Sequence, residues 1–120
     1  MLRRAFNLSG ADRLIRDLLQ QDAIVYGGYS AGACLLAPSL AGVQLADDPH
    51  SVPDGYPTEV IWEGLGVLPY AVAPHYRSEH PESADVEKMV QYFIDHHKPF
   101  LALRDGEALV VRDGTTVVVG

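Results

Sequence analysis

Apolar residues recur at helical spacing in two stretches of the chain. Over Gly10–Gln21 the apolar positions fall on one face and charged residues on the other, which predicts an amphipathic helix. A second helix is predicted over Ala84–His96, where apolar residues again share one face and Pro99 follows the end. The apolar faces consist of Leu14, Ile15, Leu18 and Leu19 in the first helix and of Val86, Met89, Val90, Phe93 and Ile94 in the second.

Short apolar runs rich in β-branched residues predict strands between and after these helices. The run Ala23–Tyr26 predicts a buried strand, followed by a short helix over Ser30–Ala37 that Pro38 closes. Asp113-Gly114 predicts that the last two runs form a β-hairpin. In a chain of 120 residues, these helices and strands predict one α/β domain over residues 1–120. The remaining strands are predicted at Val67–Ala73, Phe100–Leu103, Ala108–Val111 and Thr115–Val119.

Charge and composition exclude several kinds of partner. With 9 basic and 16 acidic residues the formal net charge is −7, so a nucleic-acid backbone would be repelled. No apolar run reaches the roughly 20 residues that cross a bilayer. The N-terminus lacks the apolar segment of a secretory signal, so we expect no membrane partner and a cytoplasmic location. Cys34 is the single cysteine, which excludes an internal disulfide and favours a buried structural thiol.

The pattern Gly28-Tyr29-Ser30-Ala31-Gly32 lies between the predicted strand and the short helix. This is the layout of a nucleophile elbow, in which a serine occupies a sharp strand-to-helix turn. The turn imposes an unfavourable backbone conformation on the serine, and the residues two positions away must be small for the chain to pass. Ser30 is therefore a candidate nucleophile. We also expect that glycine is required at both Gly28 and Gly32.

A serine nucleophile needs a base to take its proton and an acid to orient that base. His75 is the best candidate base, because it follows a predicted strand at the sheet edge where open α/β folds place their sites. For the acid, alternatives stay open. Asp105 follows another predicted strand, whereas Asp47 and Asp48 lie in a polar loop after the elbow. Each acid also has a plain interpretation as a turn or loop residue.

The other four histidines have simpler interpretations. His50 and His80 are expected to be solvated loop residues. His96 and His97 end a predicted helix, where an imidazole interacts favourably with the exposed carbonyls. No His-x-x-x-His or Cys-x-x-Cys spacing occurs, so we expect no metal site.

Three motifs in order, Gly28–Ala33, Pro74-His75-Tyr76 and Leu103–Leu109, resemble the peptidase E family of serine peptidases, which includes aspartyl dipeptidase and, more distantly, cyanophycinase. The resemblance implies a flavodoxin-like three-layer sandwich, related to class I glutamine amidotransferases, with a C-terminal β-hairpin. It implies Ser30 as nucleophile, His75 as general base, and an acid at Asp105 or in the Asp47-Asp48 loop. It also implies that the backbone amide of Ala31 supplies one oxyanion-hole donor.

The chain departs from the family pattern in length. It would correspond to about the carboxyl-terminal two thirds of a typical member, and nothing over residues 1–8 replaces the Gly-Gly-Asn loop that supplies the second oxyanion donor. Missing parallel strands would bare a sheet edge. The expected remedy is a homodimer or higher oligomer.

The resemblance implies a serine-type peptidase that hydrolyses short peptides, as a dipeptidase does, through an acyl-enzyme intermediate and without a cofactor. The arginine expected to bind an acidic substrate side chain has no match, although Arg77 is a possible substitute or a plain surface residue. One alternative is a catalytically weak or inactive homologue that acts as an oligomeric binding protein. A further alternative is an esterase or amidase that uses the same elbow.

Overall fold

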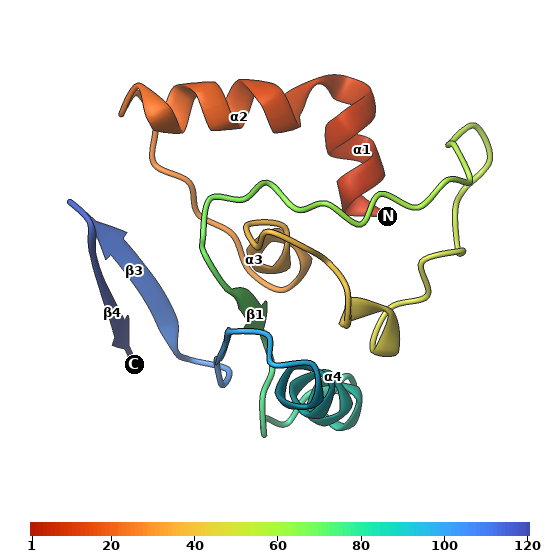
Figure 1. The fold of residues 1–120 in the computed structure, drawn as a ribbon, viewed down its shortest axis with the longest axis vertical. Coiled ribbons are helices and arrows are strands. Elements are labelled where there is room, and N and C mark those ends of the chain that lie inside the picture. Colours follow the sequence, from red (N-terminus) through yellow and green to blue (C-terminus); the bar gives the residue numbers. More distant parts are fainter.

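The computed structural model describes all residues, 1–120, as a mixed α/β fold (Figure 1). Four α-helices and four short strands are joined by long irregular segments. The helices are α1 (Leu2–Ser9), α2 (Ala11–Gln20), α3 (Ala31–Cys34) and α4 (Ser83–Asp95), with a 3₁₀ turn η1 (Val43–Leu45) between α3 and β1. The strands are β1 (Ala71–Ala73), β2 (Phe100–Ala102), β3 (Ala108–Arg112) and β4 (Thr115–Val119).

A two-stranded parallel sheet forms the centre of the molecule. β1 pairs with β2 in the register Ala71↔Phe100 to Ala73↔Ala102. Hydrogen bonds continue past the strand ends, since the Leu103 amide donates to the Ala73 carbonyl (2.9 Å) and the Tyr76 amide donates to the Leu103 carbonyl (2.9 Å). The turns that carry His75 and Asp105 therefore start from the same carboxyl edge of neighbouring strands.

The hydrophobic core lies between this sheet and α4, as the apolar face of that helix predicts. Phe93, Met89 and Val86 are the largest fully buried side chains. Ile94 is the exception on the predicted face, because 52% of it is exposed. The core cluster consists of Ala73, Val86, Met89, Val90 and Phe93. On the other side, α3 contacts β1, so the strand that precedes His75 is packed between two helices.

The N-terminal helix α1 was not predicted, and its arginines are buried. The Arg3 guanidinium pairs with Asp12 (2.9 Å), and Arg4 donates to the carbonyls of Pro49, Thr58 and Glu59 at 2.7 to 3.0 Å. Asp12, expected on a polar face, is only 3% exposed. Burial by itself raises the pKa of Asp12, but hydrogen bonds from Arg3, the Arg13 amide and Asn7 lower it overall. One buried ion pair and the hydrogen bonds of Arg4 to backbone carbonyls thus attach α1 to the rest of the chain.

Two predicted strands are wrong or too long. Residues 23–29 form no strand, and Val25 is 97% exposed. In the predicted strand Val67–Ala73, only Ala71–Ala73 pairs. The physical reason is the same in both cases, because a strand is defined by hydrogen bonds to a neighbour, and no segment of this chain lies alongside residues 23–26 or 67–70 to form a ladder.

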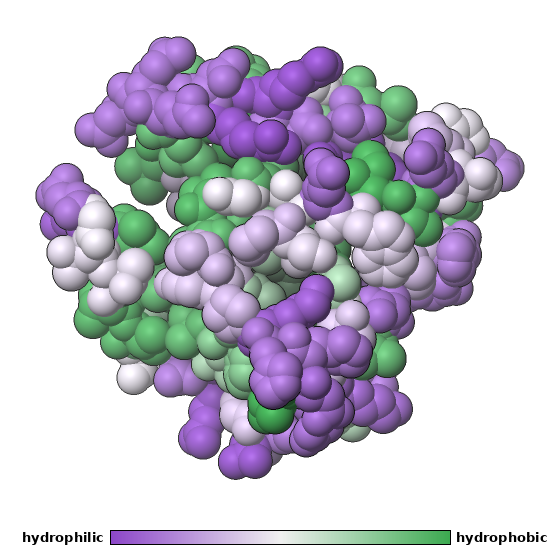
Figure 2. Space-filling view, viewed as in Figure 1, coloured by the Kyte–Doolittle hydropathy of each residue, from purple (hydrophilic) through white to green (hydrophobic).

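β3 and β4 pair antiparallel from Ala108↔Val119 to Arg112↔Thr115, around the turn at Asp113-Gly114. The hairpin stands to one side of the other elements (Figure 1), and apolar surface gathers on that side of the molecule (Figure 2). An apolar hollow of about 210 Å³ lies between the hairpin and β2. It is lined by Tyr70, Phe100, Leu101, Leu109, Thr116, Val117 and Val118. None of the helices combines the length and the apolar character that a membrane crossing requires.

Candidate active site

Ser30 occupies a strained turn immediately before α3. Its φ of 50° and ψ of −121° lie outside the conformations that non-glycine residues ordinarily adopt. Tyr26 stabilises this turn, because its hydroxyl donates a hydrogen bond of 2.7 Å to the Gly32 carbonyl. Burial raises the pKa of Tyr26, so the phenol stays protonated and can donate. Sequence reasoning did not single out Tyr26.

The two glycines of the elbow differ in how tightly they are confined. A Cβ at Gly28 would lie 2.8 Å from both the Gly32 carbonyl oxygen and the Tyr26 ring, which real Cβ atoms do not tolerate. A Cβ at Gly32 would meet only the Tyr26 hydroxyl, at an ordinary 3.5 Å. The surrounding atoms therefore leave no room for a side chain at Gly28, whereas at Gly32 they leave room for a methyl group.

Ser30, His75 and Asp105 form a continuous chain of hydrogen bonds. The Asp105 carboxylate lies 2.6 Å from Nδ1 of His75, and Nε2 of the same ring lies 3.1 Å from the Ser30 hydroxyl. Because a carboxylate only accepts, Nδ1 donates to Asp105 and Nε2 is left to accept from Ser30. The His75 side chain is 14% exposed and that of Asp105 is 47% exposed. The arrangement can move a proton from Ser30 to the imidazole.

Ser78 fixes the acid relative to the histidine. Its hydroxyl accepts from the Asp105 amide (2.8 Å) and donates to the Tyr76 carbonyl (3.0 Å). One side chain thus joins the turn after β1 to the turn after β2. Asp105 does lie in a turn, with Gly106 at φ 90°, so the plain interpretation and the functional one describe the same residue. Ser78 was missed, because a lone loop serine carries no signal in the sequence.

Asp47 and Asp48 form no hydrogen bond with His75. The Asp48 carboxylate accepts from the amide of His50 (2.9 Å), which is a local turn interaction. Asp47 borders a hollow next to the α1 arginines. Asp105 is therefore the acid that contacts the imidazole.

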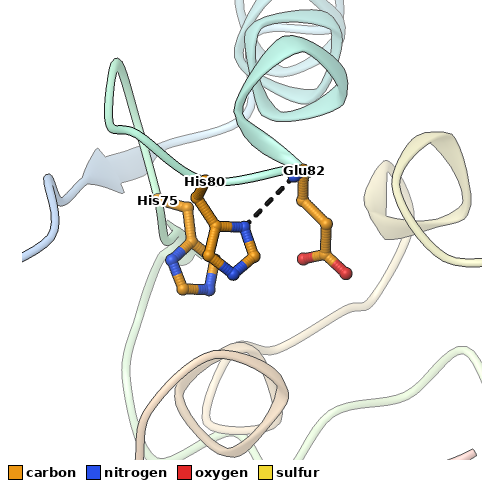
Figure 3. Close-up of side chains that lie close together, drawn as sticks. All are labelled: His75, His80 and Glu82. Carbon is orange, nitrogen blue, oxygen red and sulfur yellow. Dashed lines mark hydrogen bonds between the residues drawn. The ribbon is translucent and has the colours of Figure 1, made fainter.

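His80 and Glu82 join the site from the loop before α4 (Figure 3). The His80 ring stacks on His75 with centroids 3.6 Å apart and planes within 5°. His80 was expected to be solvated, and this expectation is wrong because the loop folds back over the imidazole. Nδ1 of His80 accepts from the Glu82 amide (3.1 Å). His50 is exposed as expected, whereas His96 lies at the end of α4 and donates from Nδ1 to the Tyr92 carbonyl (2.8 Å).

The ring nitrogens of His75 and His80 and the carboxylate of Glu82 lie within 4.8 Å of one another, close enough to hold a metal ion. Their orientation is unfavourable, because a metal binds in the plane of an imidazole and the in-plane directions of two parallel rings do not converge. Both nitrogens of His75 already have partners. As arranged here, the three groups do not fit a zinc site.

The groups around Ser30 include one free donor and one inert thiol. The Ala31 amide donates to no acceptor in the chain and is available to a ligand. Cys34 lies on α3 as expected, and its thiol donates to the Val72 carbonyl (3.5 Å). Burial raises the pKa of Cys34 to about 12, so this thiol stays neutral.

Arg77 is exposed and binds Glu87 (3.1 Å), and this hydrogen bond raises the pKa of the guanidinium.

Comparison with known proteins shows which protein family this chain resembles. The chain matches the family described as Peptidase family S51 over residues 1–119. It is 27% identical over 111 residues to a protein of Drosophila melanogaster described as an alpha-aspartyl dipeptidase, covering 88% of this chain and 43% of that protein. It is 32% identical over 100 residues to peptidase E of Streptomyces coelicolor, covering 79% of this chain and 37% of that protein.

Among solved structures, the fold is similar to that of a peptidase E protein from Listeria monocytogenes, with a TM-score of 0.80 and 22% identity. The match covers 98% of this chain and 53% of that one. The chain therefore spans about half the length of this neighbour and less than half of the curated relatives. This is a smaller share than the two thirds that the resemblance implied.

Proposed function

The chain belongs to peptidase family S51, and from this membership and the site geometry we propose that it is a serine-type peptidase that hydrolyses short peptides. The observation that carries the proposal is the hydrogen-bonded series from Asp105 through His75 to Ser30, with contacts of 2.6 and 3.1 Å. The strained backbone of Ser30 supports it independently, since such conformations persist where the surrounding structure imposes them and cluster at active sites.

In the proposed reaction the Ser30 oxygen attacks the carbonyl carbon of the peptide bond while its proton passes to Nε2 of His75. The tetrahedral intermediate then collapses, the carbon–nitrogen bond breaks, and His75 gives the proton to the leaving amine. Water next attacks the acyl ester and loses a proton to His75. This proton returns to Ser30 as the acid product leaves. Asp105 stabilises the imidazolium that forms twice in this cycle.

The amide of Ala31 is the proposed donor to the oxyanion. It follows the nucleophile directly and has no competing acceptor within the chain. One donor is worth about 10²- to 10³-fold in turnover. With the Ala31 amide as the single proposed donor, we expect turnover to be slow unless another chain supplies a second one.

Short peptides are the proposed substrates because the relatives are described as a dipeptidase and a peptidase E. Arg77 is a weak candidate for binding an acidic side chain, since Glu87 already engages it. We also propose that the fold is one part of a flavodoxin-like three-layer sandwich and that a homodimer or higher oligomer covers the exposed apolar residues of the hairpin. The cytoplasmic location stays a prediction.

The first test is covalent labelling with an alkyl fluorophosphonate, read by mass spectrometry of the intact protein. Wild type should take up one label, and Ser30→Ala and His75→Ala should take up none. His50→Ala and Ser51→Ala are matched controls, because both residues are exposed and neither forms a hydrogen bond with Ser30, His75 or Asp105. These controls should label at the wild-type rate.

Failure of folded wild type to label would overturn the peptidase proposal and favour the oligomeric binding protein. If Ser30 labels, a panel of dipeptides and simple esters separates a peptidase from an esterase that uses the same elbow. Light scattering of the same samples tests self-association, and a monomer of the expected mass, 13.1 kDa, would contradict the oligomer.

A further inference from the structure

The imidazole of His75 uses its edge for hydrogen bonds, and one of its faces is covered by His80. The two rings lie parallel, with centroids 3.6 Å apart and planes within 5° (Figure 3). An imidazole makes its hydrogen bonds in the plane of the ring. The ring of His75 therefore reaches Asp105 and Ser30 together only while its plane keeps this tilt. A second ring stacked on the face opposes a change of tilt.

Local hydrogen bonds fix His80 in this position. The Ser78 amide donates to the Ser83 hydroxyl (3.1 Å), and the Ser83 amide donates to the His80 carbonyl (3.0 Å), which closes the loop before α4. The ring itself is held by the Glu82 amide, which donates to its Nδ1 (3.1 Å; Figure 3). The backbone of this loop therefore sets where the His80 ring lies against His75.

The hydrogen bond from the Glu82 amide also sets the charge of His80. A nitrogen that accepts a hydrogen bond carries no proton, so the His80 ring is neutral in this arrangement, with its proton on Nε2. In the proposed reaction His75 becomes a cation each time it takes a proton. A neutral aromatic face stabilises a cation that lies over it. The stack is thus compatible with both charge states of His75 in the cycle.

We propose that His80 is a positioning residue of the active site, whose ring holds the His75 imidazole in the plane in which it can take the proton of Ser30. His80 forms no hydrogen bond with Ser30, so it acts through His75. The inference rests on the proposed function, because the orientation of the imidazole matters only if Ser30 is the nucleophile. It adds to the site a residue from the loop before α4.

The test separates the ring of His80 from its hydrogen bond. A role in loop structure alone would depend on the acceptor for the Glu82 amide, whereas the proposed role depends on the ring. His80→Phe keeps a flat ring that can stack on His75 and removes the acceptor. His80→Asn removes the ring and keeps a side-chain acceptor. The measured quantity is the second-order rate of Ser30 modification by an alkyl fluorophosphonate, followed by mass spectrometry, with thermal unfolding recorded for each protein.

His80→Asn should label about tenfold more slowly than wild type, which is the upper end of what an aromatic pair contributes, expressed as a rate. His80→Phe should label within about twofold of wild type. His96→Asn is the matched control, because the His96 ring also stacks on an aromatic side chain, Tyr92 (4.0 Å), but lies at the opposite end of α4. This control should label at the wild-type rate, and all four proteins should unfold at similar temperatures.

A wild-type rate for His80→Asn would overturn the inference, and so would a rate for His80→Phe as low as that for His80→Asn. A slow His80→Phe beside a fast His80→Asn would also overturn it, and would assign His80 to the structure of the loop. In each of these cases wild type still labels at Ser30 and His75→Ala does not, so the proposed function stands. Absence of labelling in folded wild type would overturn both.

Discussion

The carboxyl edge of the β1–β2 sheet and the β3–β4 hairpin are neighbours in sequence but differ in how their side chains are satisfied. At the sheet edge, the polar groups of Ser30, His75 and Asp105 each have a partner. In the hairpin, five valines remain 42% to 53% exposed. They are Val110, Val111, Val117, Val118 and Val119. The hydrogen-bonded series of Ser30, His75 and Asp105 thus forms within this chain, whereas the hairpin's apolar surface is left without cover.

The difference has a simple origin. His75 and Asp105 are positioned by two adjacent parallel strands and the turns that leave them, all of which lie within residues 71–105. Burial of a hairpin needs a further layer of structure packed on it, which the described chain does not form. Changes at the sheet edge should therefore alter the reactivity of Ser30 with little effect on folding, and changes in the core should do the reverse.

The largest effect is expected for Asp105→Asn. An amide at this position can no longer hold Nδ1–H as a carboxylate does, so His75 loses both its orientation and the tautomer that accepts from Ser30. The rate of Ser30 modification by a fluorophosphonate should fall about 10³- to 10⁴-fold, with the unfolding transition nearly unchanged. Asp48→Asn is the matched control, and a comparable loss there would mean that the acid has been assigned to the wrong loop.

Phe93→Ala should have the opposite signature. Phe93 is 1% exposed in the core beneath the site, so truncation should reduce the free energy of unfolding by about 3–5 kcal/mol. Val118→Ala, on the exposed hairpin, should reduce it by less than about 1 kcal/mol. Urea denaturation followed by circular dichroism measures both. A large loss at Val118 would show that the hairpin is covered in solution, and would support self-association through that face.

The same contrast explains which features could be predicted from the sequence. The apolar face of α4, the hairpin and the order of the turns carrying Ser30, His75 and Asp105 follow from local periodicity and turn chemistry. The absence of a strand at residues 23–26 could not be predicted, because an apolar run forms a strand only when another segment lies beside it and accepts its hydrogen bonds. Glu82 and Ser78 could not be predicted either, because loop residues are brought to the site by tertiary folding alone.

Within the elbow, the two glycines predict unequal costs. Gly28→Ala introduces a methyl group 2.8 Å from a backbone oxygen, and the resulting strain should lower the free energy of unfolding by about 1–3 kcal/mol and slow the labelling of Ser30. Gly32→Ala meets only ordinary contacts and should change stability by less than about 0.5 kcal/mol. Equal effects at both positions would mean that something outside the described contacts also confines Gly32.

Cys34 offers the smallest and most selective test, because it lies four residues beyond Ser30 but faces the core. Its pKa is raised from 9.0 to about 12 by burial, so the unfolded chain releases this proton at a lower pH than the folded one. The stabilisation is therefore complete below pH 9 and is lost as the pH rises from 9 toward 12. The loss begins near pH 9, so between pH 8 and pH 10 only about one pH unit contributes, and the free energy of unfolding falls by about 1.4 kcal/mol. Other groups titrate in this range as well, so the informative quantity is the difference between wild type and Cys34→Ala. A stability difference between the two proteins that stays constant from pH 8 to pH 10 would show that the thiol is accessible to solvent, and that the packing of α3 against β1 behind the elbow is looser than described.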